Sequence, residues 1–381
     1  MNSMKSVLFL ASLFTMNSLF SQTTIDKTMI SGGISRSYKL YIPASYNSST
    51  AVPLVLNLHG RGSTSAQQLF YGDFRSIADT ANFIMVLPQG TVHSSWGATF
   101  WNAYFGQPVN DINFLSELID TISQNYNIDQ DRIHATGMSN GGYMSLALAA
   151  GLDNKIASVA SVTGTMTVIF PSSPVNTKPI SVLQIHGTAD STVKYNGDIS
   201  SQSVNSVLNY WKTHNNTTTT PIIDSVPNIN LSDNSTAIKY TYGGGNSNTE
   251  VIHYKVVGGE HTWPGAAVNI GVTNKDFNAS DVIWKFFNKH PRTNSVGVKE
   301  VKSVSNFKFI YDMETNSVKL SGLQQEKKYS YYVYNNAGAR ILYGFVNSNT
   351  IQLPNLKSGM YIFNVVESQS GAMESRRFIS K

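Results

Sequence analysis

Three residues of this chain have the types and the order that nucleophilic catalysis requires. Ser139 lies at the centre of a Gly-x-Ser-x-Gly pattern at 137–141, Asp190 follows an apolar run, and His261 comes last. A serine hydroxyl attacks a carbonyl carbon efficiently only when a histidine removes its proton and a carboxylate orients that histidine. The order Ser, Asp, His therefore predicts Ser139 as nucleophile, Asp190 as orienting acid and His261 as base.

The pattern around Ser139 also predicts a local shape. A strand that turns sharply into a helix leaves the serine exposed on a strained turn, and glycines on either side let the two elements approach each other. We expect the strand at Arg132–Thr136 and the helix at Tyr143–Ala150. Because the chain has 28 glycines, the pattern alone is also compatible with coincidence, and an isolated Asp190 is also compatible with a helix cap.

Continuous apolar runs predict the elements that position these residues. Strands buried on both faces of a parallel sheet read as such runs, and ligands bind at the carboxyl ends of such strands. The expected strands are Pro53–Leu58, Phe83–Pro88, Ile156–Val162, Pro179–Ile185 and Val251–Val257, with two further strands within Thr23–Ile42 and one at Thr236–Tyr242.

A second glycine-rich stretch, His59-Gly60-Arg61-Gly62, directly follows the first of these runs. Glycines there let backbone amides face a developing negative charge, so we expect an oxyanion hole formed by the backbone N–H groups of Arg61 and Asn140. A plain glycine turn is the alternative. His186 ends a strand and is expected to be structural.

The expected helices are Phe74–Asn82, Asp111–Asn125 with Asp111 as its cap, Val204–His214 and Ala279–Lys289. The stretch Gln89–Val109 is irregular and rich in aromatic residues. It follows the carboxyl end of a strand, so its aromatic side chains are expected either to line a pocket or to pack onto the domain. Asn215–Ser235 is expected to be a loop.

Composition narrows the class of protein. Of 381 residues, 41% are hydrophobic and 13% are charged, which is typical of an ordered globular chain. The net charge of +5 is spread along the chain and gives no indication of nucleic-acid binding. With no cysteine there are no disulfides and no thiolate metal sites. The expected chemistry needs no cofactor and no metal.

The ends of the chain differ from its middle. Residues 1–21 combine Lys5 with an apolar stretch and predict a cleaved signal peptide, and no later segment predicts a membrane span in the mature protein. Residues 22–290 form the expected α/β domain and 291–305 a linker. Residues 306–381 carry short alternating runs separated by turn residues, which predicts a small all-β sandwich without catalytic residues.

Several motifs taken together resemble one family. They are Leu58-His59-Gly60-x-Gly62, Trp101-Asn102, Asp129-x-Asp131-Arg132, Gly137 to Gly142, His186-Gly187-x-x-Asp190, and Gly258 to Gly265. This set resembles the polyhydroxybutyrate depolymerase-like esterases, which overlap the feruloyl and acetylxylan esterases of carbohydrate esterase family 1. The resemblance covers about residues 30–290 and implies an α/β-hydrolase fold with serine esterase activity. Within or close to these motifs, His59, Trp101, Tyr195 and Trp263 are expected to contact substrate.

The resemblance leaves the substrate open. Relatives often carry cysteine at the positions of Arg61 and Phe100, and proline at the position of Lys194. We expect a feruloyl or acetyl ester on plant polysaccharide as the polymeric substrate. The alternative is poly(3-hydroxybutyrate), and a remaining alternative is an inactive, secreted binding protein.

The C-terminal segment resembles the sorting domain of the type IX secretion system of Bacteroidetes. The matching features are Leu356 to Tyr361, the strand that follows, and the basic residues Arg376, Arg377 and Lys381. The resemblance implies the outer-membrane secretion machinery as a partner and an extracellular or cell-surface location.

Overall fold

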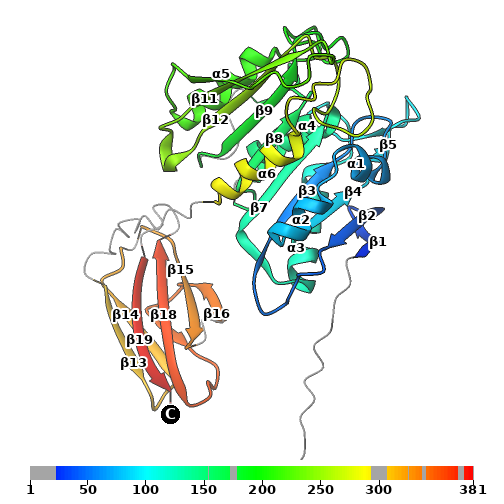
Figure 1. The fold of residues 1–381 in the computed structure, drawn as a ribbon. Helices are drawn as coiled ribbons and strands as arrows, with labels where there is room; N and C mark the ends of the chain where they lie inside the picture. The colour runs from blue at the N-terminus through cyan, green and yellow to red at the C-terminus, as the bar shows by residue number, and fades with distance from the viewer. Residues whose placement is uncertain are drawn as a thin grey trace, which may run out of the picture. The chain divides into compact units, whose positions relative to one another are not determined.

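The computed structural model describes residues 23–152, 154–171, 178–292, 307–324, 326–336, 340–367 and 373–380. The predicted signal peptide and most of the predicted linker lie outside these residues. The chain divides into two compact units, Met1–Thr293 and Asn294–Lys381 (Figure 1). Among the described residues, no helix combines the length and apolar character that crossing a membrane requires.

The first unit is built on one ten-stranded sheet in the order β1-β2-β4-β3-β7-β8-β9-β12-β11-β10. The six strands from β4 to β12 run parallel, whereas the strands at both edges are antiparallel. The strands are β1 (Thr23–Ser31), β2 (Ile34–Ile42), β3 (Val52–Leu58), β4 (Ile84–Pro88), β7 (Ile128–Met138), β8 (Ser158–Val162), β9 (Ser181–Gly187), β10 (Ile222–Ser225), β11 (Thr236–Tyr242) and β12 (Val251–Val257).

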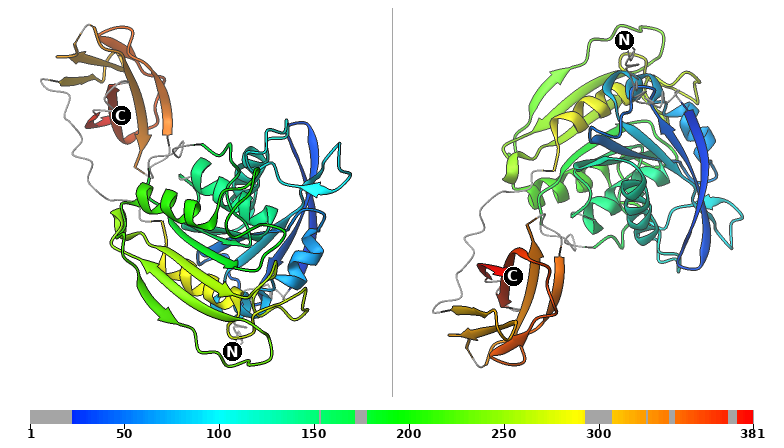
Figure 2. Two further views of the ribbon diagram at one scale, coloured as in Figure 1. Left: turned by 90° about the horizontal axis from the view of Figure 1, so that it is seen from above. Right: turned by 90° about the horizontal axis from the view of Figure 1, so that it is seen from below.

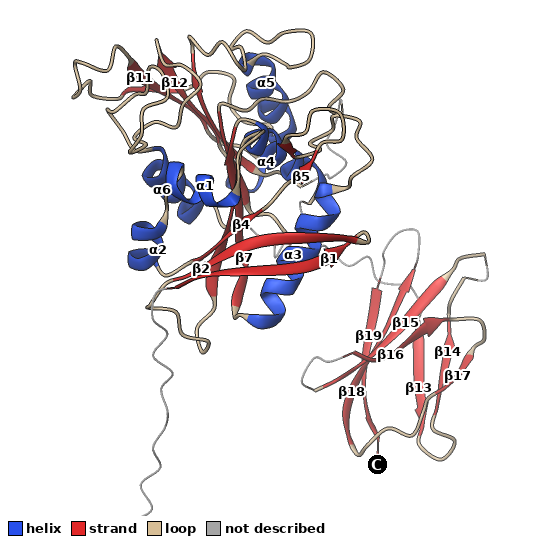
Figure 3. Ribbon diagram, turned by 90° about the vertical axis from the view of Figure 1, so that its right-hand side faces the viewer, coloured by secondary structure: helices blue, strands red, loops and turns tan. Residues whose placement is uncertain are grey.

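Helices cover both faces of this sheet (Figure 3). They are α1 (Ser65–Tyr71), α2 (Arg75–Ala81), α3 (Asp111–Asn125), α4 (Asn140–Gly151), α5 (Val204–Asn215) and α6 (Ala279–Lys289). Side chains along a strand alternate between faces, so Leu54 and Leu56 of β3 join the core under α3, α4 and α5, while Val55 joins the core under α2 and α6. Helices thus cover both faces of the parallel strands, and the carboxyl ends of these strands are the place expected to hold a site.

The expected α/β-hydrolase fold with a C-terminal all-β unit is confirmed, with differences in detail. Strand β7 begins at Ile128, four residues before the expected start at Arg132, and β10 lies within the stretch expected to be loop. Helix α1 was not expected. The cap of α3 is Asn110, whose side chain accepts from the N–H of Asn113, so the expectation that Asp111 caps it is wrong. The carboxylate of Asp111 instead binds buried Arg36 at 2.7 Å.

The second unit consists of two antiparallel sheets, β13-β14-β17 and β16-β15-β18-β19, drawn in orange to red in Figure 2. Its strands are β13 (Lys308–Asp312), β14 (Ser317–Ser321), β15 (Tyr329–Asn335), β16 (Arg340–Phe345), β17 (Thr350–Gln352), β18 (Gly359–Glu367) and β19 (Met373–Ser380). Strand β18 alternates buried and half-buried residues, and its Phe363 and Val365 form the centre of a separate small core with Val333. This is a sandwich around its own core.

Candidate active site

Four loops at one edge of the sheet hold the predicted catalytic residues. The glycine-rich stretch follows β3, Ser139 follows β7, Asp190 lies beyond the end of β9, and His261 lies beyond the end of β12. These four strands are parallel, so their carboxyl ends meet at the same edge. The fold therefore gathers residues that lie more than a hundred positions apart in the chain.

Ser139 sits on the sharp turn that its sequence pattern predicts. Its backbone has φ 55° and ψ −122°, between β7 and α4. For a residue other than glycine this conformation is strained by about 1–3 kcal/mol, so the surrounding structure must hold it. The N–H of Ser139 donates to the carbonyl of Val162 at 2.8 Å. At Gly137 a Cβ atom would lie 2.5 Å from the carbonyl oxygen of Leu58, which explains why the turn needs glycine there.

Asp190 and His261 are joined directly. The Nδ1 atom of His261 lies 2.7 Å from Oδ2 of Asp190. The other oxygen of Asp190 accepts the backbone N–H groups of Thr192 and Val193 at 2.9 and 2.8 Å. An ionised carboxylate only accepts, so Nδ1 of His261 carries the proton and Nε2 is free to act as a base.

Asp190 is buried and has a second histidine beside it. Burial would raise the pKa of this carboxyl group, but hydrogen bonds from His186 and His261 outweigh burial and hold the pKa well below its ordinary value. Gln184 donates to Nδ1 of His186 at 3.2 Å, so the proton of His186 is on Nε2, which donates to the carbonyl of Val193 at 2.8 Å and lies 3.4 Å from Oδ2 of Asp190. His186, expected to be structural, thus also supports the charge of Asp190.

Ser139 and His261 both line one cavity of 720 Å³. No hydrogen bond joins the two side chains among the described residues. In hydrolases such bonds often tighten only when substrate binds. The cavity places the predicted nucleophile and the predicted base around one space that is large enough for a small ester.

A supporting network of His59, Trp101 and Asn140 fixes the loop after β3 against the turn at Ser139. The side-chain amide of Asn140 binds the backbone of Trp101 twice, accepting its N–H at 2.6 Å and donating to its carbonyl at 3.0 Å. The indole N–H of Trp101 donates to the carbonyl of His59 at 3.0 Å. All three residues are buried. The network holds the backbone of both predicted oxyanion donors, and the roles of Arg61 and Asn140 as donors stay predictions.

His59 is a neutral, structural histidine. The N–H of Gly90 donates to its Nε2 at 2.9 Å, so Nδ1 carries the proton and donates to the carbonyl of Gly60 at 2.7 Å. Burial lowers the pKa of His59 to about 4, against a smaller opposing effect of the bond to Gly60. The side chain thus pins the loop that carries Arg61.

The four predicted substrate contacts do not line the cavity. Trp101 and His59 lie in the supporting network, and the indole N–H of buried Trp263 donates to Ser280 at 3.2 Å. The hydroxyl of Tyr195 lies 2.8 Å from Nε2 of His253. Their positions favour packing and support of the site, and contact with substrate stays a prediction.

The aromatic stretch 89–109 packs onto the domain. It contains a short hairpin of β5 (Thr91–Val92) and β6 (Thr99–Phe100). Phe100 is buried and Phe105 is half-buried, with their rings 5.1 Å apart. Trp96 is the exception, because it stacks on His93 at 3.9 Å and remains half-exposed. For Phe100, the packing alternative is the one that the structure favours.

The wall of the cavity is formed by two segments that were not predicted from the sequence to be part of the site. Helix α1 contributes Phe70 and Tyr71, and the loop after His261 contributes Val268 and Ile270. Tyr71 also accepts the backbone N–H of Trp263 at 3.1 Å, which ties the two segments together. A capping pattern, Thr64-x-x-Gln67, was the available signal for α1.

We name Arg61, Phe70, Val268 and Ile270 the cavity rim. Phe70, Val268 and Ile270 are 64%, 51% and 56% exposed, and all four residues line the cavity with Ser139. Apolar side chains at this exposure are free to bury against a substrate.

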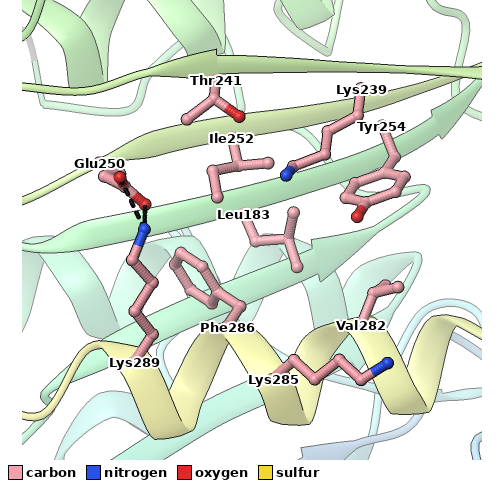
Figure 4. Close-up of a pocket in the computed structure, with 10 residues that line it drawn as sticks. All are labelled: Leu183, Lys239, Thr241, Glu250, Ile252, Tyr254, Val282, Lys285, Phe286 and Lys289. Atoms are coloured by element: carbon pink, nitrogen blue, oxygen red, sulfur yellow. Dashed lines mark hydrogen bonds and ion pairs between the residues drawn. The ribbon is translucent and has the colours of Figure 1, made fainter. Parts of the chain in front are cut away.

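A second, smaller cavity of 210 Å³ lies between α6 and strands β11 and β12 (Figure 4). Leu183 and Phe286 form its apolar floor, and Lys289 binds Glu250 at 2.7 Å beside it. No serine or histidine of the described part of the chain lines it. It lacks the groups that nucleophilic catalysis requires.

Comparison with known proteins agrees with the fold. The phospholipase/carboxylesterase family matches residues 109–242, which include Ser139 and Asp190. The bifunctional acetylxylan esterase/xylanase XynS20E of Neocallimastix patriciarum is 27% identical over 63% of this chain and 33% of its own length. Feruloyl esterase D of Neurospora crassa is 26% identical over 42% of this chain and 54% of its own. The chain thus spans about a third to about half of the length of these curated relatives.

Among solved structures, a ferulic acid esterase of Anaeromyces mucronatus in complex with ferulic acid is 18% identical, covers 72% of this chain and 92% of its own, and has a TM-score of 0.44. The sheet order and the turn at Ser139 show an α/β-hydrolase fold, and the chain is similar in sequence to proteins named as esterases.

Proposed function

We propose that the chain hydrolyses carboxylic esters through a covalent acyl-enzyme on Ser139. His261 removes the proton of Ser139, whose oxygen attacks the ester carbonyl. The backbone N–H groups of Arg61 and Asn140 stabilise the resulting oxyanion. His261 then protonates the departing alcohol, and Asp190 stabilises the charged imidazole. Water, activated by His261, releases the acid in the same way.

One observation carries this proposal: the 2.7 Å contact between His261 Nδ1 and Asp190 Oδ2, at the cavity that Ser139 lines. A buried carboxylate fixes both the tautomer and the orientation of the base. A histidine placed for packing alone needs no such partner at the mouth of a cavity. The arrangement suits acyl transfer and supplies its nucleophile, base and orienting acid.

The leading substrate is a feruloyl or acetyl ester on plant polysaccharide. The relatives named as acetylxylan and feruloyl esterases support it. The cavity of 720 Å³ accommodates an aromatic acyl group, and pockets for such groups are mostly apolar.

A polyester such as poly(3-hydroxybutyrate) is the second candidate. Its specific support is the cavity rim, where Phe70, Val268 and Ile270 expose apolar surface around the nucleophile. A chain of apolar ester units would bury that surface without needing a sugar-binding subsite.

Ester hydrolysis by wild type and Ser139→Ala tests both the catalytic role of Ser139 and the identity of the substrate. The substrates are methyl ferulate, acetylated xylan and a poly(3-hydroxybutyrate) film. We expect wild type to release ferulate or acetate, Ser139→Ala to lose this activity, and Ser206→Ala, an exposed serine on α5, to keep it. Turnover of the film alone would replace the leading substrate with the second candidate. Equal rates in Ser139→Ala and wild type would mean that Ser139 is not the nucleophile.

We also propose that residues 1–21 direct export and that residues 306–381 act as the sorting signal for an outer-membrane secretion machinery. The basic residues Arg376 and Arg377 on β19 support this, as does the separate core of the second unit. Expression in a bacterium with a type IX system tests it. Full-length chain should reach the medium or the cell surface, and a chain lacking 306–381 should stay in the periplasm. Equal export of both would contradict the proposal.

A further inference from the structure

Arg61 is distinctive among the arginines of the hydrolase unit. Residues 23–292 contain five arginines, and four of them bind a carboxylate: Arg36 with Asp111, Arg75 with Asp73, Arg132 with Asp129 and Arg292 with Asp131. Arg61 has no carboxylate within ion-pair distance among the described residues. It therefore keeps its full capacity to bind an anion.

The cavity gives this guanidinium no competing charge. Among the described residues that line the cavity, Arg61 is the only Lys, Arg, Asp or Glu. Asp190, which contacts His261, is buried and already accepts hydrogen bonds on both oxygens. An anionic group entering the cavity would meet one cation and no fixed negative charge.

The position of Arg61 is held by the structure. Its guanidinium carbon lies 5.5 Å from the centre of the Trp96 ring, which in turn stacks on His93 at 3.9 Å. A cation over an aromatic face loses part of its freedom without losing its ability to donate hydrogen bonds. Its backbone also belongs to the loop that the supporting network fixes. Arg61 thus lines the cavity while its guanidinium is held beside Trp96.

The remaining rim is apolar. Phe70, Val268 and Ile270 line the same cavity, so one part of a bound ester would bury against them while another part meets Arg61. An arginine binds a carboxylate with two parallel hydrogen bonds, a geometry that a neutral ester or hydroxyl does not match.

From these contacts we infer that the natural ester carries a carboxylate near the scissile bond, and that Arg61 selects it. This inference rests on the proposed esterase function and narrows its substrate class to acidic esters. Two sources share this chemistry: an acyl group that ends in a carboxylate, as in an oligomer of hydroxy acids, or an alcohol part that carries one, as in an acidic sugar.

Two pairs of matched esters test the inference and separate the sources. On the acyl side, p-nitrophenyl hydrogen succinate is compared with methyl p-nitrophenyl succinate. On the alcohol side, p-acetoxybenzoate is compared with p-acetoxybenzamide. In each pair the readout is the ratio of kcat/KM for the anionic ester to that for the neutral one.

Arg61→Met keeps the backbone amide and most of the side-chain volume but removes the charge. We expect wild type to prefer the anionic ester in one pair, and Arg61→Met to lower that ratio roughly fivefold, with Arg61→Lys in between. Salt should lower the wild-type ratio, because an exposed pair is screened. Lys285→Met is the control, since Lys285 lies in the second cavity (Figure 4) and its loss changes the net charge equally.

An unchanged ratio in Arg61→Met would overturn the inference, as would an equal fall in Lys285→Met, which would indicate net charge alone. If neutral esters are hydrolysed in a Ser139-dependent manner while the ratios do not respond to Arg61, the inference fails and the esterase function stands. If wild type hydrolyses no ester, the proposed function fails and the inference falls with it.

Discussion

The two sides of the candidate site are built in opposite ways. On the inner side, the supporting network of His59, Trp101 and Asn140 is buried, and every member is hydrogen-bonded. On the outer side, the cavity rim exposes three apolar side chains and an arginine without a carboxylate partner among the described residues. Both sides meet at Ser139.

This difference in construction assigns catalysis to the inner side and the choice of substrate to the rim. Catalysis needs donors and a nucleophile held within a fraction of an ångström, and a buried, satisfied network provides that rigidity. Selection needs surface that gains contacts only when the substrate arrives, and the rim provides it. Changes to the inner side should therefore affect turnover or stability, whereas changes to the rim should affect which ester binds.

The largest effect is expected at Asp190, which orients the predicted catalytic base His261. Asp190→Asn would reverse the hydrogen bond to His261 and favour the wrong tautomer, so we expect kcat to fall about 10⁴-fold. Circular dichroism should show a folded chain. Asp224→Asn, on the exposed edge strand β10, should keep wild-type turnover. A loss of less than tenfold in Asp190→Asn would mean that Asp190 does not orient the base.

A smaller effect is expected from the supporting network. Asn140→Ala keeps the backbone N–H but removes both bonds to Trp101, which frees the loop that carries Arg61. A displacement of about 1 Å at a reacting group lowers the rate about 10²-fold. We therefore expect kcat to fall by about that factor with KM little changed. If kcat stays within twofold of wild type, the network has no part in positioning the site.

The buried His59 of the inner side should also make the folded chain less stable in acid. An unfolded histidine binds a proton near pH 6.5, whereas burial lowers the pKa of His59 to about 4. The unfolded chain therefore gains protons first as the pH falls, and the free energy of unfolding should drop by about 2 kcal/mol between about pH 7 and pH 5 on account of this residue.

Urea unfolding of His59→Gln at both pH values measures this contribution. Glutamine retains a donor and an acceptor but does not titrate, so the pH dependence of the variant should be about 2 kcal/mol smaller than that of wild type. His214→Gln, on the half-exposed side of α5, is the matched control. The same pH dependence in His59→Gln and wild type would show that His59 is not held neutral by burial.

The smallest effect is expected at the rim. Phe70 is 64% exposed, so Phe70→Ala should change the free energy of unfolding by less than about 0.5 kcal/mol. KM for methyl ferulate should rise about three- to tenfold through the lost apolar contact. Ile199→Ala, at a fully solvated position, should change neither. A large loss of stability in Phe70→Ala would place this residue in the core instead of the rim.

Sequence predicted the parts of the molecule that depend on local pattern or chain order. The apolar runs gave the parallel strands, and the pattern around Ser139 gave its turn, because only glycine fits at 137 beside the end of β3. The positions of Asp190 and His261 after strands followed from the order of elements. Their direct contact needed the structure.

The features that could not be predicted from sequence depend on contacts between segments that are distant in the chain. Asp111 looked like a helix cap because its partner, Arg36, lies 75 positions away. Helix α1 is only seven residues long and polar at its start, so its periodicity is too short to recognise. Its meeting with the loop after His261 joins Tyr71 to Trp263 across 192 positions. The cavity wall therefore could not be assigned from the chain alone.

Labelling with a fluorophosphonate, which reacts with activated serines, tests the central claim most directly. Intact-mass measurement and peptide mapping would locate the adduct. We predict one adduct per chain, on the peptide that contains Ser139, formed much more slowly in Asp190→Asn. An adduct on another serine, or no adduct on folded wild-type protein, would contradict the assignment of Ser139 as the nucleophile.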